Sequence, residues 1–423
     1  MITVGIFGAS SQSGMAYFAD FTNQGIPVVG YVWDEPQGIE VVNAINYNNG
    51  INLIRPENIN HEGSKLVKLK ISILTHDISE LVDKSDIIII AIPSHLHFNA
   101  IQSLKDNRIL NKKIPIILSP SRTFATPYIW KILEYKYPII CFSTSPYSAK
   151  TVNPNTVYIK RRKRTWTGTI EGNLKKQHIN IIKKIFPQVA LTKIPSLTSL
   201  NNIGAVFHPA TYILNYDEIC YRNNMGIEFS YYIEGIANNL TVGDFLEKID
   251  QTRLEIANYL GIESFGYSEN TREDTWRKLT KGLRALEDEH EGEIEVLRRI
   301  RKLFVEYLNN CVLSSQHWLD ITYGVERIEN ESLSNAIRRT PTYQKNSFPQ
   351  IRYIEEDIPT GLVPFEALAI RFNINHNEIT YVINEYDKIF NTNIRMNGRN
   401  LEEFSDQFII NYLTGKFNAD EEY

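Results

Sequence analysis

The chain has 423 residues, of which 43% are hydrophobic and 22% charged, and its formal net charge is −4. This length predicts two domains, and the small net charge argues against nucleic acid or an anionic membrane as a partner. Three widely spaced cysteines without a CxxC pair argue against a disulfide framework and a structural zinc site. The sequence begins in an apolar segment without a basic leader and has no run of about 18 apolar residues, so we expect a cytoplasmic protein.

The first half of the chain alternates between short apolar runs and helical stretches. TVGIFG at 3–8 precedes a helical stretch that ends at Gly25, and IPVVGYVW at 26–33 follows as a second strand. Further β-branched runs are DIIIIAIPS at 86–94, IPIILSPS at 114–121 and PIICFSTSP at 138–146. Strands that are apolar on both faces are typical of parallel sheets covered by helices. The predicted fold of this half is therefore a Rossmann-like, doubly wound parallel sheet.

The turn after the first predicted strand indicates a dinucleotide site. Such a turn meets the phosphates in doubly wound sheets, although GASSQSG has serines at the second and third glycine positions of GxGxxG. Asp34 closes the second strand, where an acid accepts hydrogen bonds from ribose hydroxyls and repels a 2′-phosphate. We therefore expect NAD(H) to be preferred, and the sequence leaves NADP(H) open. The predicted cofactor-binding residues are Gly8, Ala9, Ser10, Ser11, Gln12, Ser13, Asp34 and Pro93.

The second half of the chain is dominated by helical periodicity. VGDFLEKIDQTRLEIANYLG at 242–261 has apolar residues at helical spacing and a terminal glycine, and the pattern continues over 272–313 and 377–390. We therefore expect an NAD(P)-binding domain over 1–195, followed by an all-α substrate-binding and catalytic domain over 196–423.

Two segments of the second half carry candidate catalytic side chains. His208 is the titratable residue of the apolar helical stretch NNIGAVFHPATYILN, and taken alone it is more typical of a packed core. Arg352 and Asp357 stand five positions apart in RYIEEDIPTGLVP, which we predict to be extended up to its proline. This pair is also compatible with an ion pair that holds a loop. Glu355 and Glu356 are expected to face solvent.

The order of these segments resembles that of the octopine/nopaline (opine) dehydrogenase family. The resemblance covers about residues 1–370, and its most specific motifs are the HP dipeptide and R-Y-x-x-E-D-x-P-x-G-L-V-P. It implies an NAD(P)H-dependent reductive condensation of an amino acid with a 2-oxo acid through an imine, together with the reverse oxidation at the CH–NH bond. It also implies that the family's catalytic histidine, aspartate and arginine correspond to His208, Asp357 and Arg352.

Elementary chemistry agrees with these assignments. Hydride reduction of a C=O or C=N group needs a proton donor, and imidazole titrates near neutral pH. A carboxylate at the far ring nitrogen fixes the tautomer, which is the role expected of Asp357, while the planar guanidinium of Arg352 suits a substrate carboxylate. Asn215 and Lys150 are further predicted substrate contacts, Lys150 standing where we expect arginine from the resemblance. We predict no metal site.

Other functions stay open on the sequence alone. They are a two-domain 2-/3-hydroxy acid or ketopantoate-type dehydrogenase, a non-catalytic dinucleotide-binding sensor, and an opine metallophore synthase. The first class uses a catalytic lysine in its helical domain, and no lysine lies in a comparable apolar helix after residue 195. The sequence does not identify the amino acid or the oxo acid, and it leaves the state of assembly open, with a homodimer among the options.

Overall fold

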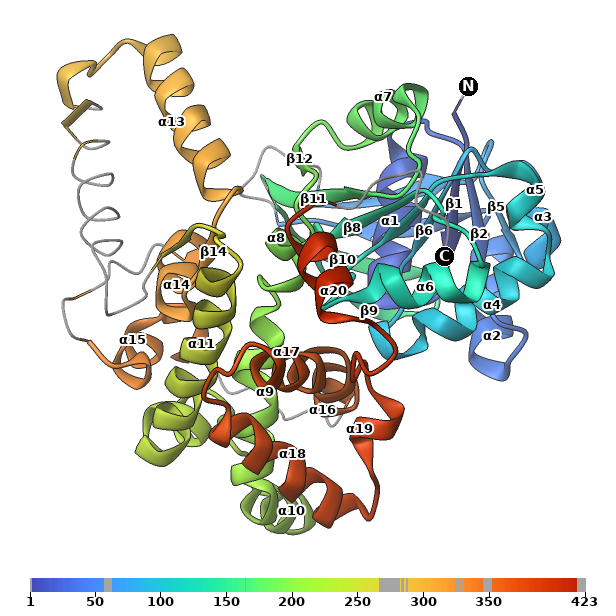
Figure 1. Ribbon diagram of the computed structural model, residues 1–423. Coiled ribbons are helices and arrows are strands. Elements are labelled where there is room, and N and C mark those ends of the chain that lie inside the picture. Colours follow the sequence, from blue (N-terminus) through green and yellow to red (C-terminus); the bar gives the residue numbers. More distant parts are fainter. Residues whose placement is uncertain are drawn as a thin grey trace. The chain divides into compact units, whose positions relative to one another are not determined.

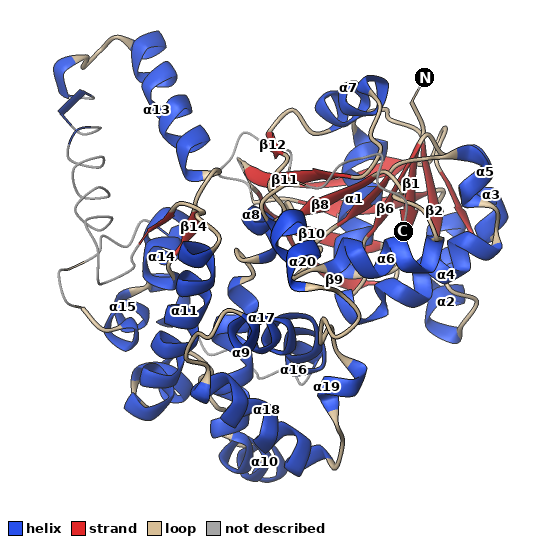
Figure 2. Ribbon diagram, in the orientation of Figure 1, coloured by secondary structure: helices blue, strands red, loops and turns tan. Residues whose placement is uncertain are grey.

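The chain folds into two compact units. The structure, a computed structural model, describes residues 2–56, 63–163, 165–265, 288–323, 331–344 and 352–416, and the single residues 282, 285, 286 and 328. The first unit consists of Met1–Ser121 and Ala125–Thr198, and the second of Arg122–Phe124 and Ser199–Lys416. Figure 2 shows that the strands gather in the first unit and that helices make up almost all of the second.

An eight-stranded sheet forms the centre of the first unit (Figure 1). Its order is β12-β11-β8-β7-β6-β1-β2-β5, and neighbouring strands are parallel except for β8 and β11. The doubly wound sheet is therefore confirmed, with one antiparallel pair that the sequence did not reveal. The strands are β1 (Val4–Phe7), β2 (Val28–Tyr31), β5 (Ile73–Thr75), β6 (Ile87–Ile90), β7 (Ile116–Leu118), β8 (Ile139–Phe142), β11 (Trp166–Glu171) and β12 (Val189–Thr192).

The central strand β1 explains why the strand sequences are apolar throughout. Val4 and Ile6 belong to the core on the side of the first helix, while a Cβ at Gly5 would meet Leu81 and Ile88 on the other side. Both faces are thus covered. The four isoleucines of the neighbouring β6 are fully buried, and each such side chain contributes about 1.5–3 kcal/mol on burial.

A second sheet, which the sequence did not predict, covers the outer side of helix α1 (Gln12–Asn23). This helix contacts β1 and β2 of the main sheet and all four strands of the second sheet, so the nine residues Gly14–Thr22 are all buried. The second sheet has the order β4-β3-β10-β9 and consists of β3 (Gly50–Ile54), β4 (Ser64–Lys68), β9 (Tyr147–Asn153) and β10 (Thr156–Arg162).

A buried carboxylate, Asp20, links α1 to this second sheet. Its side chain is 2% exposed, accepts a hydrogen bond from the Tyr147 hydroxyl at 2.6 Å and forms ion pairs with Arg55 and Arg162. Two guanidinium groups therefore compensate the buried negative charge. The remaining helices of the first unit are α2 (Pro36–Tyr47), α3 (Ile78–Lys84), α4 (His97–Asp106), α5 (Ile109–Lys112), α6 (Ala125–Leu133) and α7 (Lys176–Ile185), and α8 (Ser196–Ser199) leads into the second unit.

The second unit is helical, as predicted, with one short parallel pair of strands, β13 (Ser264–Phe265) and β14 (Val312–Leu313). The helices predicted over 242–261 and 377–390 are confirmed as α11 and α18, whereas residues 272–281 lie outside the described part of the chain. The helices are α9 (Ile203–Leu214), α10 (Tyr216–Met225), α11 (Leu240–Tyr259), α13 (Ile294–Leu308), α14 (Ser315–Tyr323), α15 (Leu333–Arg339), α16 (Arg352–Asp357), α17 (Val363–Arg371), α18 (Asn377–Phe390), α19 (Ile394–Asn397) and α20 (Asp406–Leu413).

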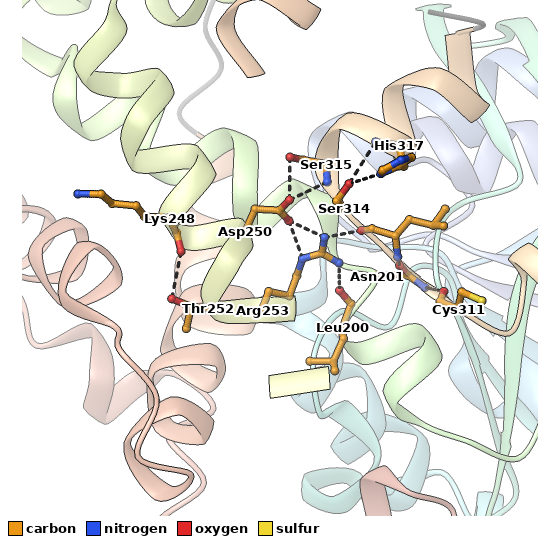
Figure 3. Close-up of polar contacts among 11 residues, drawn as sticks. Leu200, Asn201, Lys248, Asp250, Thr252, Arg253, Cys311, Ser314, Ser315 and His317 are labelled. Atoms are coloured by element: carbon orange, nitrogen blue, oxygen red, sulfur yellow. Dashed lines mark hydrogen bonds and ion pairs between the residues drawn. The ribbon is translucent and has the colours of Figure 1, made fainter. Parts of the chain in front are cut away.

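A buried ion pair fixes α11 within this unit (Figure 3). The fully buried Arg253 lies 2.5 Å from Asp250 and donates to the carbonyl of Leu200 at 2.6 Å, just before α9. The second carboxylate oxygen of Asp250 accepts from the backbone N–H of Ser315 at 2.8 Å, at the start of α14. Every partner of this buried charge comes from the second unit, so the pair anchors the segment from which α9 begins.

The helices that the structure describes are too short or too polar to cross a lipid bilayer.

Candidate active site

His208 and Asp357 form a hydrogen-bonded pair in the second unit. His208 lies in α9 and Asp357 ends α16, and Nδ1 of the histidine is 2.6 Å from Oδ2 of the aspartate. The aspartate side chain is fully buried, whereas 19% of the histidine side chain is exposed. Because an ionised carboxylate can only accept, Nδ1 carries the shared hydrogen. Nε2 is then the ring nitrogen that can exchange a proton with a substrate.

Arg122 adds a positive charge to this pair. Its Nη2 lies 3.4 Å from Oδ1 of Asp357, its Nε donates to Glu356 at 3.1 Å, and its Nη1 donates to Oδ1 of Asn202 at 3.1 Å. Burial by itself would lower the pKa of Arg122, but attraction to Asp357 and Glu356 outweighs it and raises the pKa above the ordinary value. The guanidinium therefore stays charged and compensates the buried carboxylate of Asp357.

The segment Arg122–Phe124 belongs to the second unit although it follows β7 in the sequence. Thr123 donates its backbone N–H to Thr360 at 3.1 Å and accepts a hydrogen bond from Arg399 at 2.6 Å. Arg122 and Phe124 both have positive φ angles, of 61° and 53°. Large side chains rarely adopt this backbone conformation, and it persists only where surrounding contacts hold it.

Two glycines make room for the charged cluster. A Cβ at Gly204 would lie 2.9 Å from both Nη1 of Arg122 and Oδ2 of Asp357. A Cβ at Gly361 would lie 2.4 Å from the methyl of Ala205, so this glycine lets the chain after α16 approach α9. Glycine inside a helix costs about 1 kcal/mol relative to alanine. The charged cluster occupies the space that a side chain at position 204 would need, which explains why α9 has a glycine there.

Tyrosine rings pack against His208. The ring of Tyr353 stacks on the imidazole with 4.4 Å between centroids and an interplanar angle of 23°, and the Tyr231 ring lies 6.1 Å away. Burial, and then the neighbouring Tyr232, raise the pKa of Tyr231 well above its ordinary value. Its hydroxyl therefore stays protonated and donates to the carbonyl of Phe207 at 2.9 Å. These contacts limit rotation of the imidazole, as a proton-transfer group requires.

The segment RYIEEDIPTGLVP is helical, and the prediction that it is extended is wrong. Arg352–Asp357 forms α16, and the π-helical turn Ile358–Leu362 continues directly into α17. Both prolines of the segment lie in the first turn of a helical element, where a missing N–H is tolerated. The helical period also separates the two glutamates: Glu355 is exposed as expected, whereas Glu356 turns inward with 13% of its side chain exposed.

The three predicted substrate contacts lie in different surroundings in the structure. Arg352 begins α16, but its side chain lies outside the described residues, so its role stays a prediction. The amide of Asn215 donates to the carbonyls of Thr211 at 2.7 Å and Gly235 at 3.1 Å, and its oxygen accepts from Asn239 at 3.1 Å. This geometry gives Asn215 a structural role, and its contact with substrate stays a prediction. Lys150 is exposed on the outermost strand β9 in the first unit, and its contact with substrate also stays a prediction.

The predicted nucleotide turn lies where the strand order of the main sheet reverses. β1 is flanked by β2 on one side and β6 on the other, and ligands of doubly wound sheets bind at this switch point. Ser11 caps α1 by accepting from the N–H of Gly14 at 2.9 Å, and its hydroxyl donates to the carbonyl of Ala91 after β6 at 2.5 Å. The N–H groups of Gln12 and Ser13 begin the helix, where amides lack intrahelical acceptors and bind phosphate.

Gly14 occupies the close-packing position that the GxGxxG pattern assigned to Ser13. A Cβ on Gly14 would lie 2.0 Å from the carbonyl oxygen of Gly8, so only glycine lets α1 start this close to β1. Gly8 itself has a φ angle of 87°, which favours glycine. The fingerprint is thus shifted by one residue. The glycine pair Gly8 and Gly14 shapes the turn, and the serines Ser10 and Ser13 are tolerated within it.

The remaining predicted cofactor residues lie on the loops after three strands of the main sheet, β1, β2 and β6. Ala9 and Ser10 belong to the β1–α1 turn, Asp34 is exposed three residues after β2, and Pro93 precedes the 3₁₀ turn Ser94–Leu96 that follows β6. Burial, and then the charges of Asp34 and Glu35, raise the pKa of Tyr31 at the end of β2. These residues fit a dinucleotide with the pyrophosphate at the start of α1 and a ribose near Asp34. Among the described residues, no three or more His, Cys, Asp and Glu side chains gather in a way that could hold a metal ion.

The fold and these two sites define a class of protein. A doubly wound sheet with a glycine turn at its switch point, followed by a helical unit with a histidine–aspartate pair, is the layout of two-domain NAD(P)-dependent oxidoreductases. Residues 196–390 match the family model of the NAD/NADP octopine/nopaline dehydrogenase α-helical domain. This matched part of the chain contains the HP dipeptide and the R-Y-x-x-E-D-x-P-x-G-L-V-P motif, so the match agrees with the resemblance that the motifs indicated.

Similar proteins cover both units of the chain. An opine dehydrogenase from Arthrobacter sp. (strain 1C) is 24% identical over 339 residues, which are 78% of each chain. The solved structure of octopine dehydrogenase with NADH and L-arginine has a TM-score of 0.69 at 14% identity, over 99% of both chains. The NADP⁺-bound yersinopine dehydrogenase has a TM-score of 0.61 at 13% identity, over 98% of this chain and 99% of its own. The two solved proteins share the fold of this chain.

Proposed function

We propose that the protein is an opine dehydrogenase that joins an amino acid to a 2-oxo acid by reductive condensation and catalyses the reverse oxidation. The observation that carries this proposal is the 2.6 Å contact between His208 and Asp357, which presents Nε2 of the histidine as the proton-transfer atom. We assign cofactor binding to the first domain, predicted over 1–195, and substrate binding and catalysis to the second, predicted over 196–423. The bond that is formed and broken would be of the CH–NH type.

Proton transfer by His208 is needed at two stages of this reaction. The amine adds to the carbonyl of the oxo acid, and the resulting carbinolamine loses hydroxide as water when the imidazolium of His208 donates its proton at Nε2. Formation of the imine returns the N–H proton of the carbinolamine to His208, which would donate it to the imine nitrogen when the nicotinamide of bound NAD(P)H supplies a hydride to the imine carbon, giving a secondary amine. In the reverse direction neutral His208 accepts the proton. Asp357 stabilises the imidazolium at both stages.

We further propose that Arg352 binds a carboxylate of the substrate. It lies at the start of α16, the helix that also holds Asp357, so the backbone of one short helix would position both groups. A guanidinium binds a carboxylate through two parallel hydrogen bonds, which fixes the direction of the bound group. Octopine dehydrogenase has been solved with L-arginine and with pyruvate, which supports an amino acid and a small 2-oxo acid as the substrate classes here.

The preferred cofactor is proposed to be NAD(H). Structures of relatives contain NADH in one case and NADP⁺ in another, so the fold accepts both and the choice depends on residues of this chain. The exposed carboxylate of Asp34 follows β2, where it can accept hydrogen bonds from both ribose hydroxyls and would repel a 2′-phosphate. A cytoplasmic location and a homodimeric state stay predictions from the sequence.

The experiment that tests the proposal follows nicotinamide absorbance with panels of amino acids and 2-oxo acids, with NADH and NADPH in parallel. We expect oxidation only when both substrates are present, and a product whose mass equals the two substrates minus one oxygen atom. His208→Asn is the matched negative control. Oxidation with the oxo acid alone would instead indicate a hydroxy acid dehydrogenase, and tight cofactor binding without turnover would indicate a sensor.

A further inference from the structure

We propose that Arg122 and Glu356 are positioning residues that tune the His208–Asp357 pair through opposite charges, Glu356 favouring the protonated imidazole and Arg122 opposing it while holding Asp357 in place. This inference deepens the proposed function and rests on it for the role of His208 as proton donor. It concerns Arg122, which lies outside the motifs of the sequence analysis, and Glu356, which the sequence analysis expected to face solvent.

The contacts of Arg122 show that it acts on protein groups. Its three nitrogens point to three partners: Nε to Glu356 at 3.1 Å, Nη1 to Asn202 at 3.1 Å and Nη2 to Asp357 at 3.4 Å. A flat fork with donors in three directions can hold two carboxylates and an amide at once, which the point charge of a lysine cannot do. Arg122 is thus placed to orient Asp357, and through it His208, without serving as a carboxylate clamp for substrate.

The charge balance of the cluster depends on His208. Asp357 and Glu356 carry two negative charges against the single positive charge of Arg122. Counted over these four side chains alone, binding of a proton to the imidazole changes the summed charge from −1 to 0. The two carboxylates therefore promote protonation of His208, and the guanidinium limits it.

Other described ionisable groups also lie around α9, while the side chain of Arg352 on α16 lies outside the described residues. The phenols of Tyr353 and Tyr231 pack against the imidazole and are uncharged acids at neutral pH. Several charged groups on the elements packed against α9 form ion pairs with other partners, namely Asp250 with Arg253, Lys248 with Glu378, Glu385 with Lys388, Asp387 with Arg395, and Glu218 and Glu234 with Arg222.

Local structure is built around this arrangement. The chain holds Arg122 at a φ angle of 61°, which a large side chain rarely adopts, and α9 has a glycine at 204 where a Cβ would collide with both Arg122 and Asp357. The fully buried Asp357 and the 1% exposed Asn202 leave the guanidinium little freedom to move away. Such convergence of unusual local features is expected where a charged group must be held in one place.

The test measures the protonation of His208 directly, without turnover. Diethyl pyrocarbonate acylates neutral imidazole, so the dependence of its reaction rate at His208 on pH gives the midpoint of protonation. The same measurement on the His208→Asn form of each variant gives the signal of the other histidines, which is subtracted. We expect Arg122→Gln to move the midpoint up by about one pH unit and Glu356→Gln to move it down by about the same amount. Arg122→Lys keeps the charge and should leave the midpoint near that of wild type while kcat falls.

The matched controls are Arg298→Gln and Glu295→Gln, an exposed arginine–glutamate pair on α13, which should leave the midpoint unchanged. A shift of Arg122→Gln and Glu356→Gln in the same direction, or no shift in either folded variant, would overturn the proposal. If Arg122→Gln does not fold, an unchanged midpoint in Glu356→Gln is sufficient to overturn it. If the wild-type protein condenses no substrates, the proposed function fails, yet the acylation profiles still decide this inference.

Discussion

The carboxylate of Asp357 lies 2.6 Å from Nδ1 of His208, although 149 positions separate the two residues in the chain. The aspartate is fully buried, and the ring that it holds is partly exposed. This combination fixes which nitrogen of the imidazole is presented to a substrate. The relationship gives direct predictions for variants of the pair and for the residues that make space for it.

Replacing Asp357 by asparagine should lower kcat by about 10²–10⁴-fold with a smaller effect on KM. The amide keeps the shape of the side chain but not its charge, so the imidazolium loses its stabilising partner and the wrong tautomer becomes favourable. Steady-state kinetics of D357N, H208N and the double variant check this. The two losses should be far from additive because the residues act as a unit. A kcat near that of wild type in D357N would remove the pair from the mechanism.

Adding a methyl group at Gly204 should lower both stability and activity. Alanine normally stabilises a helix relative to glycine by about 1 kcal/mol, but here its Cβ would lie 2.9 Å from Arg122 and Asp357. We expect a loss of about 1–3 kcal/mol from overpacking, measured by urea denaturation, together with a lower kcat. Gly282→Ala is the control, because the structure has open space around that position. A more stable G204A variant would show that the cluster can shift freely.

Alanine at Gly14 should abolish or strongly weaken dinucleotide binding. The added Cβ would lie 2.0 Å from the carbonyl oxygen of Gly8, so the start of α1 must move away from β1 and take its phosphate-binding amides with it. Titration of the variant with NADH, followed by fluorescence, measures the change in Kd. Ser13→Gly should bind as wild type does, because Gly14 already supplies the close approach. Weak binding by S13G with normal binding by G14A would reverse our assignment.

Cofactor choice should depend on Asp34. Replacing this exposed carboxylate by arginine removes the repulsion of a 2′-phosphate and supplies a partner for it, so the ratio of kcat/KM for NADPH to that for NADH should rise by about 10–100-fold. Glu35→Gln removes an exposed neighbouring charge and should leave the ratio nearly unchanged. An equal change of this ratio in both variants would mean that it depends on the total negative charge of this loop and not on Asp34 in particular.

Stability should fall in mild acid partly because of His178. Burial, and then the charge of Lys175, lower the pKa of His178 in the folded protein below 6.5. The unfolded chain then binds more protons between the folded pKa and 6.5, so the contribution is complete above about pH 6.5 and is lost as the pH falls through the folded value. Urea midpoints of wild type and His178→Gln, compared from about pH 8 to about pH 5, should converge at the acid end. Parallel curves would contradict this role.

Much of the first domain could be predicted from local sequence patterns. Its apolar runs predicted the central strands because strands covered on both faces need apolar side chains at every position, as the four isoleucines of β6 show. Glycine and serine after β1 identified the turn at the switch point. Local patterns did not reveal the second sheet, because its packing against α1 depends on contacts such as that between Asp20 and Tyr147, 127 positions apart.

The residues of the candidate site were also only partly predictable from the sequence. A single histidine in an apolar helix and an unusual Arg–Glu–Asp string could be recognised from the sequence, since titratable residues stand out against an apolar background. The inward turn of Glu356 could not, because helical period decides it and prolines in the segment suggested an extended chain. No sequence pattern around Arg122 indicated that it belongs to the site. Only the tertiary structure brings this residue of the loop after β7 to the carboxylate of Asp357, since compensation of a buried charge is a matter of distance in space and not of position in the chain.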